Sequence, residues 1–466
     1  MDVSMRRSSP VVLSAPFVLA VLAGCARTPP ASDKPSGTTN TVPLPAASAT
    51  VSAQGAMLAS ASVAAPTAPP APVAPPSDAN VILISIDSLR ADMPWSGYPR
   101  PIAPRLTELE KKAVSYTHAY SVSSYTSMSL GGLLGAKLPS ELQRDGYFFG
   151  TYNKDNRFFP ELLQAAKVHT MAAQAHFYFK SGSGFEQGFD EWEIVPGIKS
   201  DNTTDQNITS PQSEQIAERL LGNAANNSRR FFFWAHFLDP HDQYMPHDGV
   251  GPYGKTDRDK YDAEVTYTDQ YVGKLLDFIA TKPWAGKTAI ILTSDHGEAF
   301  GEHGRTRHGF EIWEPLVRVP LMLVLPGAPA RHIDRPRSAL DVSQTIMELL
   351  GVAPDASYEG KSLVKEAYGA DAEVRDVYVD LPATSDNDKR RALIRGNFKL
   401  TCYTNDNICK LFDLNDDPTE DKPIGSGDKF DELHAAYLAH VKTMHEVEPY
   451  NCHPGTCLNG AYHNRH

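Results

Sequence analysis

Four continuous apolar runs, rich in β-branched and aromatic residues, recur along the chain from residue 81 onward. They cover residues 81–86, 229–238, 288–293 and 319–325. Runs of this length and composition are typical of strands buried on both faces of a sheet. Amphipathic patterns between and around them predict helices over residues 103–114, 159–167, 263–280 and 341–351. Buried strands alternating with such helices predict an α/β fold, in which helices flank a mostly parallel central sheet.

The pattern changes near residue 370, where short strands and turns replace the long apolar runs. Residues 391–414, RALIRGNFKLTCYTNDNICKLFDL, predict two hairpin strands around a polar turn that is flanked by cysteines. We therefore expect a main domain over residues 79–370 and a small C-terminal α+β subdomain over residues 371–466.

The first 78 residues predict targeting and attachment to a membrane surface. Residues 1–24 contain two arginines and then a short apolar run, and the sequence LAGC at residues 22–25 resembles a bacterial lipobox. We expect a lipoprotein signal peptide, a lipid on Cys25 and a location in the bacterial cell envelope; an ordinary signal peptide is the alternative. Residues 25–78, rich in Ala, Pro, Ser and Thr, predict a disordered tether.

Charge and cysteine content limit the partners and the compartment. The formal net charge of −12 argues against nucleic acid as a partner, because such binders normally carry a basic surface. Apart from Cys25, the cysteines all lie near the C-terminus, which in an exported protein predicts disulfides. The local pairs are Cys402–Cys409 and Cys452–Cys457; two other connectivities, or a metal-binding cluster, are the alternatives.

Polar residues follow three of the predicted strands directly. They are Asp87 after the first, Asp239 and His241 after the second, and Asp295 and His296 after the third. Ligands of open α/β sheets bind beyond the carboxyl ends of the strands, so these side chains should share one rim. Each aspartate alone could cap a helix and each histidine could be structural. Together, with His303 and His308 following, they predict a divalent metal site.

Several segments between residues 79 and 425 resemble the sulfatase family of the alkaline phosphatase superfamily. They include NVILISIDSLRAD, HFLDPHDQY, LTSDHGEAFGEHG and HGFEIWEPLVRVPLMLVLPG, in family order. The resemblance implies that Asp87, Asp295 and His296 bind the metal. It also implies that His241 and His308 contact the transferred group or protonate the leaving group.

The resemblance also locates the nucleophile, in the segment SSYTSMSLGGLLG at residues 123–135. In the family a Cys or Ser begins a motif with a following Pro and Arg, and the motif leads into a small-residue helix that ends in two leucines. Aligning Leu133 and Leu134 with those leucines places Thr126 at the nucleophile position. Met128 then replaces the Pro and Leu130 replaces the Arg, so the conversion of Cys or Ser to formylglycine that sulfatases use cannot occur here.

A second departure is Ser88, where many sulfatases have another aspartate. The implied metal set is then Asp87, Thr126, Asp295 and His296, which resembles the set in phosphoethanolamine and glycerol-phosphate transferases and in some phosphonate or phosphodiester hydrolases. Such a set suits Mn²⁺ or Zn²⁺, with Ca²⁺ or Mg²⁺ as alternatives. Phosphate-type chemistry is favoured, because phosphothreonine can be cleaved by a second in-line attack, whereas sulfated threonine lacks the elimination open to formylglycine.

These observations predict a metal-dependent hydrolase that cleaves a phosphate, phosphonate or sulfate ester through a covalent Thr126 intermediate. The substrate would be a small molecule or an ester of an envelope glycan or lipid. A phospho-substituent transferase and an inactive binding protein of the same fold are the alternatives.

We further expect residues 140–158 and 176–210 to line the pocket. Arg90 and Asp92 should brace the Asp87 loop, and His303 should support its own loop. A second metal site built on Asp239, His241 and His308 is a lesser alternative.

Overall fold

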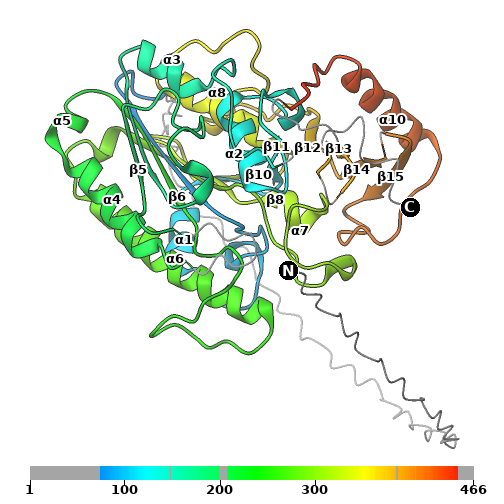
Figure 1. Cartoon of the computed structure of the whole chain (residues 1–466), viewed down its shortest axis with the longest axis horizontal. Coiled ribbons are helices and arrows are strands. Elements are labelled where there is room, and N and C mark those ends of the chain that lie inside the picture. Colours follow the sequence, from blue (N-terminus) through cyan, green and yellow to red (C-terminus); the bar gives the residue numbers. More distant parts are fainter. Residues whose placement is uncertain (1–73, 147, 199–206, 385–386, 405, 450–466) are drawn as a thin grey trace, which may run out of the picture. The chain divides into compact units, whose positions relative to one another are not determined.

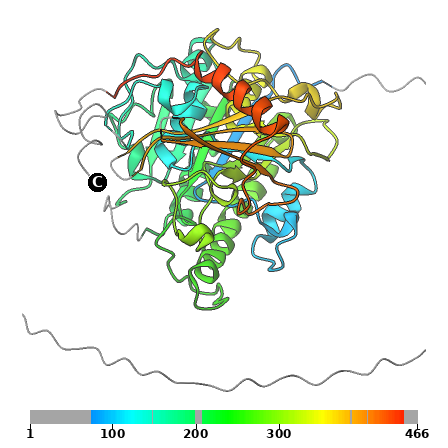
Figure 2. The same ribbon diagram turned by 90° about the vertical axis from the view of Figure 1, so that its right-hand side faces the viewer.

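A computed structural model describes residues 74–146, 148–198, 207–384, 387–404 and 406–449. The expected signal peptide, Cys25, most of the tether and the pair Cys452–Cys457 therefore lie outside the described residues. Figures 1 and 2 show a large sheet covered on both faces by helices, with a smaller sheet at one side.

The central sheet contains eight strands. They are β1 (Asn80–Ile86), β2 (Val114–Tyr116), β4 (His169–Gln174), β5 (Glu191–Ile194), β6 (Phe231–Phe237), β7 (Thr288–Ser294), β9 (Leu321–Val324) and β10 (Arg331–Ile333). Their spatial order is β10-β2-β9-β7-β1-β6-β4-β5. Only β9 runs antiparallel to its neighbours, so the prediction of a mostly parallel sheet is confirmed.

Helices on the two faces of this sheet build two separate apolar cores. The described helices are α1 (Pro104–Glu110), α2 (Thr126–Gly135), α3 (Phe159–Ala165), α4 (Ser210–Gly222), α5 (Ala224–Asn227), α6 (Asp257–Ala280), α7 (Glu314–Val317), α8 (Ala339–Leu349), α9 (Val364–Ala367) and α10 (Asp428–Val441). Val81 and Leu83 of β1 pack with residues of α2, α3 and α8. Ile82 and Ile84 pack with residues of α1, α4 and α6 on the opposite face. Both faces of β1 are therefore buried, as its unbroken apolar run predicts.

The sequence prediction fails locally where proline or a short strand interrupts the pattern. The run at 319–325 is divided at Pro320, which has no backbone N–H to donate. Its first part, β8 (Arg318–Val319), joins β3 (Ala119–Tyr120) and β11 (Arg337–Ser338) in a separate three-stranded sheet. The predicted helix 103–114 stops at Glu110, and its last residue begins β2. The prediction also missed β4, β5 and α4.

The C-terminal subdomain is a four-stranded antiparallel sheet with one helix on it. Its strands are β12 (Val377–Leu381), β13 (Arg390–Arg395), β14 (Phe398–Tyr403) and β15 (Ile408–Asp413), in that spatial order. Helix α10 covers one face, as Figure 2 shows, and packs Leu433 and Tyr437 on Leu393 and Leu400. The predicted hairpin around the cysteine-flanked turn corresponds to β14 and β15. Residues 391–395 of the same stretch form most of β13.

The local pairing Cys402–Cys409 is confirmed, because these residues lie opposite each other on β14 and β15 and form a disulfide. Among the described residues, no helix is both long and apolar enough to cross a membrane.

Candidate metal centre and active site

Two adjacent parallel strands bring the predicted metal ligands together. Strands β1 and β7 pair in register up to Ile86 and Ser294, so Asp87 and Asp295 emerge side by side from the sheet. Together with His296 they offer ligand atoms that all lie within 4.8 Å of one another. All three side chains are buried. The structure therefore brings together the carboxylates and imidazole that the sequence placed on one rim.

The donor atoms of this cluster fit a divalent cation. His296 donates from Nδ1 to the carbonyl of Gly297 (2.9 Å), which leaves the lone pair of Nε2 facing the cluster. Nε2 lies 3.4 Å from Asp295 Oδ2 and 3.7 Å from Asp87 Oδ1. Within the described structure, Asp295 Oδ2 is buried and has no hydrogen-bond partner. A cation would satisfy this oxygen, and two carboxylates with one imidazole are ligands that Zn²⁺ and Mn²⁺ accept.

The pKa values of the three groups show the effect of placing like charges together in a buried site. Burial, and then the negative charge of Asp87, raise the pKa of Asp295. Burial opposes ionisation of Asp87 too, but His241, His236 and His296 together lower its pKa well below the usual value. Burial, and then His308, lower the pKa of His296. Neutral imidazole is the form that binds metal, and a cation would allow both carboxylates to ionise.

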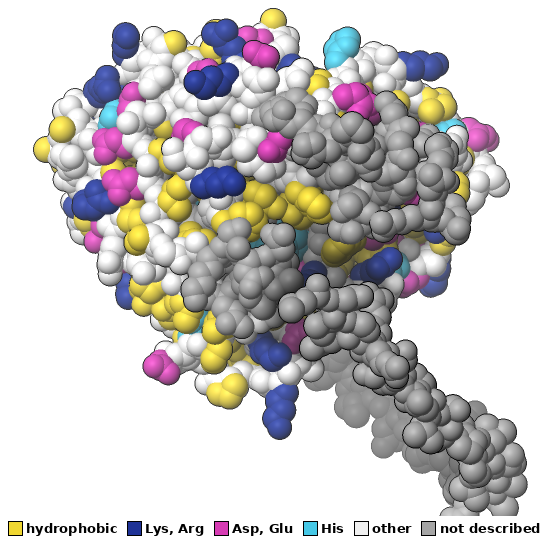
Figure 3. Space-filling model, in the orientation of Figure 1, with side chains coloured by type: hydrophobic (Ala, Val, Ile, Leu, Met, Phe, Trp, Pro, Cys, Tyr) yellow, Lys and Arg dark blue, Asp and Glu magenta, His cyan; other side chains and the backbone are white. Residues whose placement is uncertain are grey.

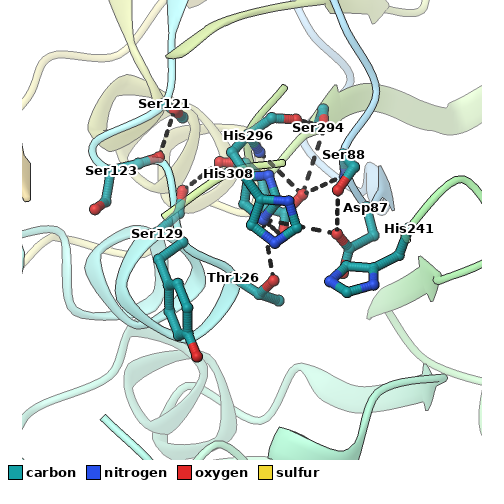
Figure 4. Close-up of polar contacts among 12 residues, drawn as sticks. Asp87, Ser88, Ser121, Ser123, Thr126, Ser129, His241, Ser294, His296 and His308 are labelled. Atoms are coloured by element: carbon teal, nitrogen blue, oxygen red, sulfur yellow. Dashed lines mark hydrogen bonds and ion pairs between the residues drawn. The ribbon is translucent and has the colours of Figure 1, made fainter. Parts of the chain in front are cut away.

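Thr126 lies directly beside the cluster, at the beginning of α2 (Figure 4). Its Oγ1 is 3.0 Å from His296 Nε2, and the residue is buried. Ser129, on the next turn, donates from Oγ to the carbonyl of Asp295 (2.6 Å) and so fixes α2 against the metal loop. Met128 and Leu130 are fully buried in the apolar core. The side chains of Met128 and Leu130 therefore serve packing.

In Figure 4, His241 lies beside Asp87, and His308 lies close to His296. The ring centroid of His308 is 4.8 Å from that of His241 and 4.2 Å from that of His296. Nδ1 of His308 is 3.2 Å from Oε1 of the buried Glu298. Burial disfavours the charged imidazole, but Glu298, Asp87 and Asp242 together outweigh it and raise the pKa of His308. His308 can therefore carry a proton next to Thr126.

Asp239 does not join this centre. Its carboxylate accepts hydrogen bonds from the N–H and hydroxyl of Thr209 (2.5 and 2.6 Å) and from the N–H of Ser210 (2.7 Å). These contacts satisfy backbone donors at the beginning of α4, which is what a capping aspartate does. Among the described residues, the one group that could hold a metal is Asp87, Asp295 and His296. The alternative of a second metal site on Asp239 is therefore wrong.

Arg90, Asp92 and His303, predicted to support the loops of the site, form ion pairs and a ring contact there. Arg90 forms a two-pronged ion pair with Asp92 (2.7 and 2.9 Å) and also bonds Glu302 (2.7 Å), which ties the Asp87 loop to the loop after β7. His303 stacks near Trp313, with 4.2 Å between ring centroids. These contacts agree with a bracing role for Arg90 and Asp92 and with loop support by His303.

Part of the expected pocket wall lies next to Thr126. Phe148 contacts the ring of Tyr125 at 5.8 Å between centroids, and Ser127 donates to the carbonyl of Phe148. Tyr178 hydrogen-bonds Tyr125 through their hydroxyls. Phe148 and Tyr178 thus contact the residues on either side of Thr126 in the chain, whereas residues 199–206 lie outside the described residues.

Sequence reasoning missed two residues that contact the site, His236 and Glu298. His236 lies inside the apolar run of β6, and its Nε2 is 3.2 Å from Asp87 Oδ2. A polar residue two positions after Trp234 shares its face of the strand, so the alternation of β6 could have indicated a buried partner for Asp87. Glu298, within GEAF, gave no signal that it would pair with His308.

Comparison with known proteins identifies the family. The profile described as "Sulfatase" matches residues 79–352, more than half of the chain. The chain belongs to the sulfatase family. A second profile, "N-sulphoglucosamine sulphohydrolase, C-terminal", matches residues 301–446 of this sulfatase-family chain. Members of the family bind a divalent metal, for which Asp87, Asp295 and His296 supply a ligand group here.

Curated relatives and solved structures agree with this assignment. The chain is 23% identical over 419 residues to a choline-sulfatase of Rhizobium meliloti, an alignment that covers 73% of this chain and 81% of that protein. A sulfatase of Formosa agariphila is 37% identical over 107 residues, covering 22% of this chain and 21% of that protein. The phosphonate monoester hydrolase of Agrobacterium radiobacter shares the fold, with a TM-score of 0.65 and 16% identity over 78% of this chain and 95% of that one. This sulfatase-family protein is therefore an ester hydrolase.

Proposed function

We propose that the protein is a metal-dependent hydrolase that cleaves a phosphate or phosphonate ester through a covalent intermediate on Thr126. The observation that carries the proposal is the position of Thr126 Oγ1, 3.0 Å from His296 Nε2 and at the N-terminal end of a ten-residue helix. A nucleophile is activated when its hydroxyl lies at a cation site or next to a base. Ser88 also bonds a side chain of the ligand group, Asp87, but Thr126 is the hydroxyl that bonds the imidazole of His296 and begins a helix.

Asp87, Asp295, His296 and Thr126 would hold the cation in this proposal. The bound cation would lower the pKa of the Thr126 hydroxyl and neutralise negative charge on the oxygens of the ester. Its identity is proposed as Mn²⁺ or Zn²⁺, because the donor set includes a nitrogen.

The chain's own groups account for two in-line displacements. Oγ1 of Thr126, whose proton passes to bulk water, attacks phosphorus, while N–H groups in the first turn of α2 stabilise the charge that develops on the non-bridging oxygens. His308, whose pKa Glu298 raises, donates a proton to the departing oxygen of the ester. The neutral His308 then accepts a proton from water, and that water displaces Thr126 from phosphorus, which releases the phosphorus product and leaves Oγ1 as the alkoxide for the next attack.

The preference for phosphorus rests on Thr126 and on the buried Met128 and Leu130. The sequence lacks the Pro and Arg that accompany formation of formylglycine, so the threonine ester must be cleaved directly. Phosphorus esters allow such a second displacement. A phosphonate monoester hydrolase has the same fold, which supports the proposal.

The substrate we propose is a small molecule or an ester of an envelope lipid or glycan. Over the described part of the face in Figure 3, cationic and anionic side chains are interspersed and form no extended basic surface that would suit nucleic acid. We also propose attachment to the envelope through a lipid on Cys25, on the basis of the LAGC sequence. Metabolic labelling with a fatty-acid probe tests this attachment: the full-length chain should incorporate the probe, and Cys25→Ser should not.

A panel of aryl phosphate monoesters, phosphate diesters, phosphonate monoesters and sulfates, assayed with added Mn²⁺ or Zn²⁺, tests the function. Thr126→Ala should abolish turnover, whereas Thr126→Ser should retain part of it, because a hydroxyl remains. Thr281→Ala is the matched control, since this exposed threonine ends α6 and lies ahead of the N-terminal end of β7.

Equal turnover by Thr126→Ala and the wild-type protein would exclude Thr126 as the nucleophile. Turnover of sulfates alone would contradict the preference for phosphorus.

A further inference from the structure

A chain of buried hydrogen bonds reaches Asp87 at Oδ2, the oxygen other than the one near His296. The indole Nε1 of Trp234 lies 2.8 Å from Ser85 Oγ, which in turn lies 2.8 Å from His236 Nδ1. His236 Nε2 lies 3.2 Å from Asp87 Oδ2. All four side chains are fully buried. Ser85 and His236 face each other in the β1–β6 register, so the sheet itself sets this geometry.

The groups at the two ends of this chain set the direction of its hydrogen bonds. An indole N–H can only donate, so Ser85 Oγ accepts from Trp234. The Asp87 carboxylate can only accept, so Nε2 of His236 carries the proton that it donates to Asp87 Oδ2. In the tautomer with its proton on Nε2, Nδ1 of His236 accepts from the hydroxyl of Ser85. The ring of Phe179 packs edge-on against His236, with 5.3 Å between centroids.

Both oxygens of Asp87 thus accept a hydrogen bond from a neighbouring side chain. Ser88, which stands where many sulfatases have a second aspartate, donates from Oγ to Oδ1 (3.0 Å). Oδ1 is also the oxygen that faces the cluster, 3.7 Å from His296 Nε2. The hydrogen bond from His236 to Oδ2 fixes the orientation of the carboxylate, so that Oδ1 points toward the position of a cation.

We propose that His236 is a positioning residue of the metal centre, set in one tautomer by Trp234 and Ser85, which orients Asp87 for cation binding. This role rests on the metal site of the proposed function, and it is independent of whether Thr126 is the nucleophile. Partners of this kind typically change metal affinity by 10- to 100-fold when they are removed.

Metal affinity of the purified full-length protein, stripped with a chelator, tests the proposal. Mn²⁺, Zn²⁺ and Co²⁺ are titrated in competition with a chromophoric chelator, and Co²⁺ absorption reports the coordination geometry. His236→Leu should weaken binding by about 10- to 100-fold, and His236→Gln should restore much of it, because an amide N–H can reach Asp87. Ser85→Ala should cause a smaller loss, because the tautomer is no longer enforced. His169→Leu is the matched control, since it removes a His–Asp contact (2.9 Å) of a buried histidine at the first residue of β4, the opposite end of the sheet.

Thermal unfolding of each metal-free variant establishes that it is folded. A folded His236→Leu protein with wild-type affinity and an unchanged Co²⁺ spectrum would overturn the proposal. If His236→Leu does not fold, the comparison of Ser85→Ala and His236→Gln with the wild type decides: wild-type affinity in Ser85→Ala would overturn it. A wild-type protein that binds none of the three ions would overturn the metal-dependent function and this inference with it.

Discussion

Replacement of Lys399 by Met should destabilise the junction between the C-terminal sheet and the catalytic part. Lys399 lies on β14 and is fully buried, with Nζ 2.7 Å from the carbonyl of Ile312, 3.2 Å from Glu314 Oε1 and 3.0 Å from Glu420 Oε1. Glu314 and Glu420 come from different segments, and the N–H of Glu314 donates to Glu420 Oε2 (2.6 Å). The ammonium group of Lys399 is thus the positive charge that lies between the two buried carboxylates of Glu314 and Glu420.

The expected loss follows from leaving those carboxylates without a cation. Breaking a buried ion pair by removing one partner costs about 3–5 kcal/mol, and we expect a loss of that size at neutral pH. The loss should depend on pH. Burial, and then repulsion from Glu314, raise the pKa of Glu420 even against the attraction of Lys399, and Lys399→Met removes that attraction. A carboxyl whose pKa is higher in the folded state favours folding at low pH, so the loss should grow as pH rises above the unfolded value of 4.5.

Urea unfolding followed by tryptophan fluorescence at pH 5 and pH 8 measures this difference. Lys429→Met is the control, because Lys429 pairs with Glu432 on the exposed side of α10 and should leave stability unchanged. A loss below about 1 kcal/mol at pH 8, or equal losses at both pH values, would refute the reasoning, because a buried unpaired carboxylate should cost more than that.

Three further changes separate structural from functional contacts. Cys402→Ser should cost about 2 kcal/mol in urea unfolding, because the disulfide closes a loop with a sequence separation of 7; an unchanged midpoint would contradict this. Asp239→Ala should cost about 1 kcal/mol by uncapping α4, with metal stoichiometry by elemental analysis unchanged; a loss of bound metal would return Asp239 to the metal centre. Asp295→Asn should abolish metal binding and yet stabilise the chelated protein, since burial and Asp87 raise the pKa of Asp295. If the metal-free variant is less stable than the metal-free wild type, repulsion between Asp87 and Asp295 does not destabilise the protein.

The sequence predicted the site best where an apolar strand pattern ends directly at a residue that can bind metal. The run before Asp87 is buried on both faces and ends at a polar residue, and parallel pairing then brings Asp87 and Asp295 together without further information. It was least informative where the outcome depended on contacts distant in sequence. Asp239 could be a ligand or a cap, and the decision comes from Thr209 and Ser210, 30 and 29 residues away.

The same limit explains why His236 and Lys399 were missed. The alternation of β6 shows that His236 shares a face with Trp234, but only the register of β1 with β6 reveals Ser85 as its neighbour. Lys399 stands in the strand pattern FKL, which does not show that its charge is buried against Glu314 and Glu420. In both cases the chemistry depends on tertiary pairing that one sequence does not encode locally.

The central claim is that Thr126 forms the covalent intermediate. Rapid acid quenching during turnover of a phosphate diester or phosphonate monoester, followed by peptide mass spectrometry, measures it directly. We expect the peptide containing Thr126 to carry the transferred phosphorus group on that residue, to lose it as substrate is exhausted, and otherwise to contain unmodified threonine. Steady turnover with Thr126 never modified, and undiminished activity in Thr126→Ala, would contradict the mechanism.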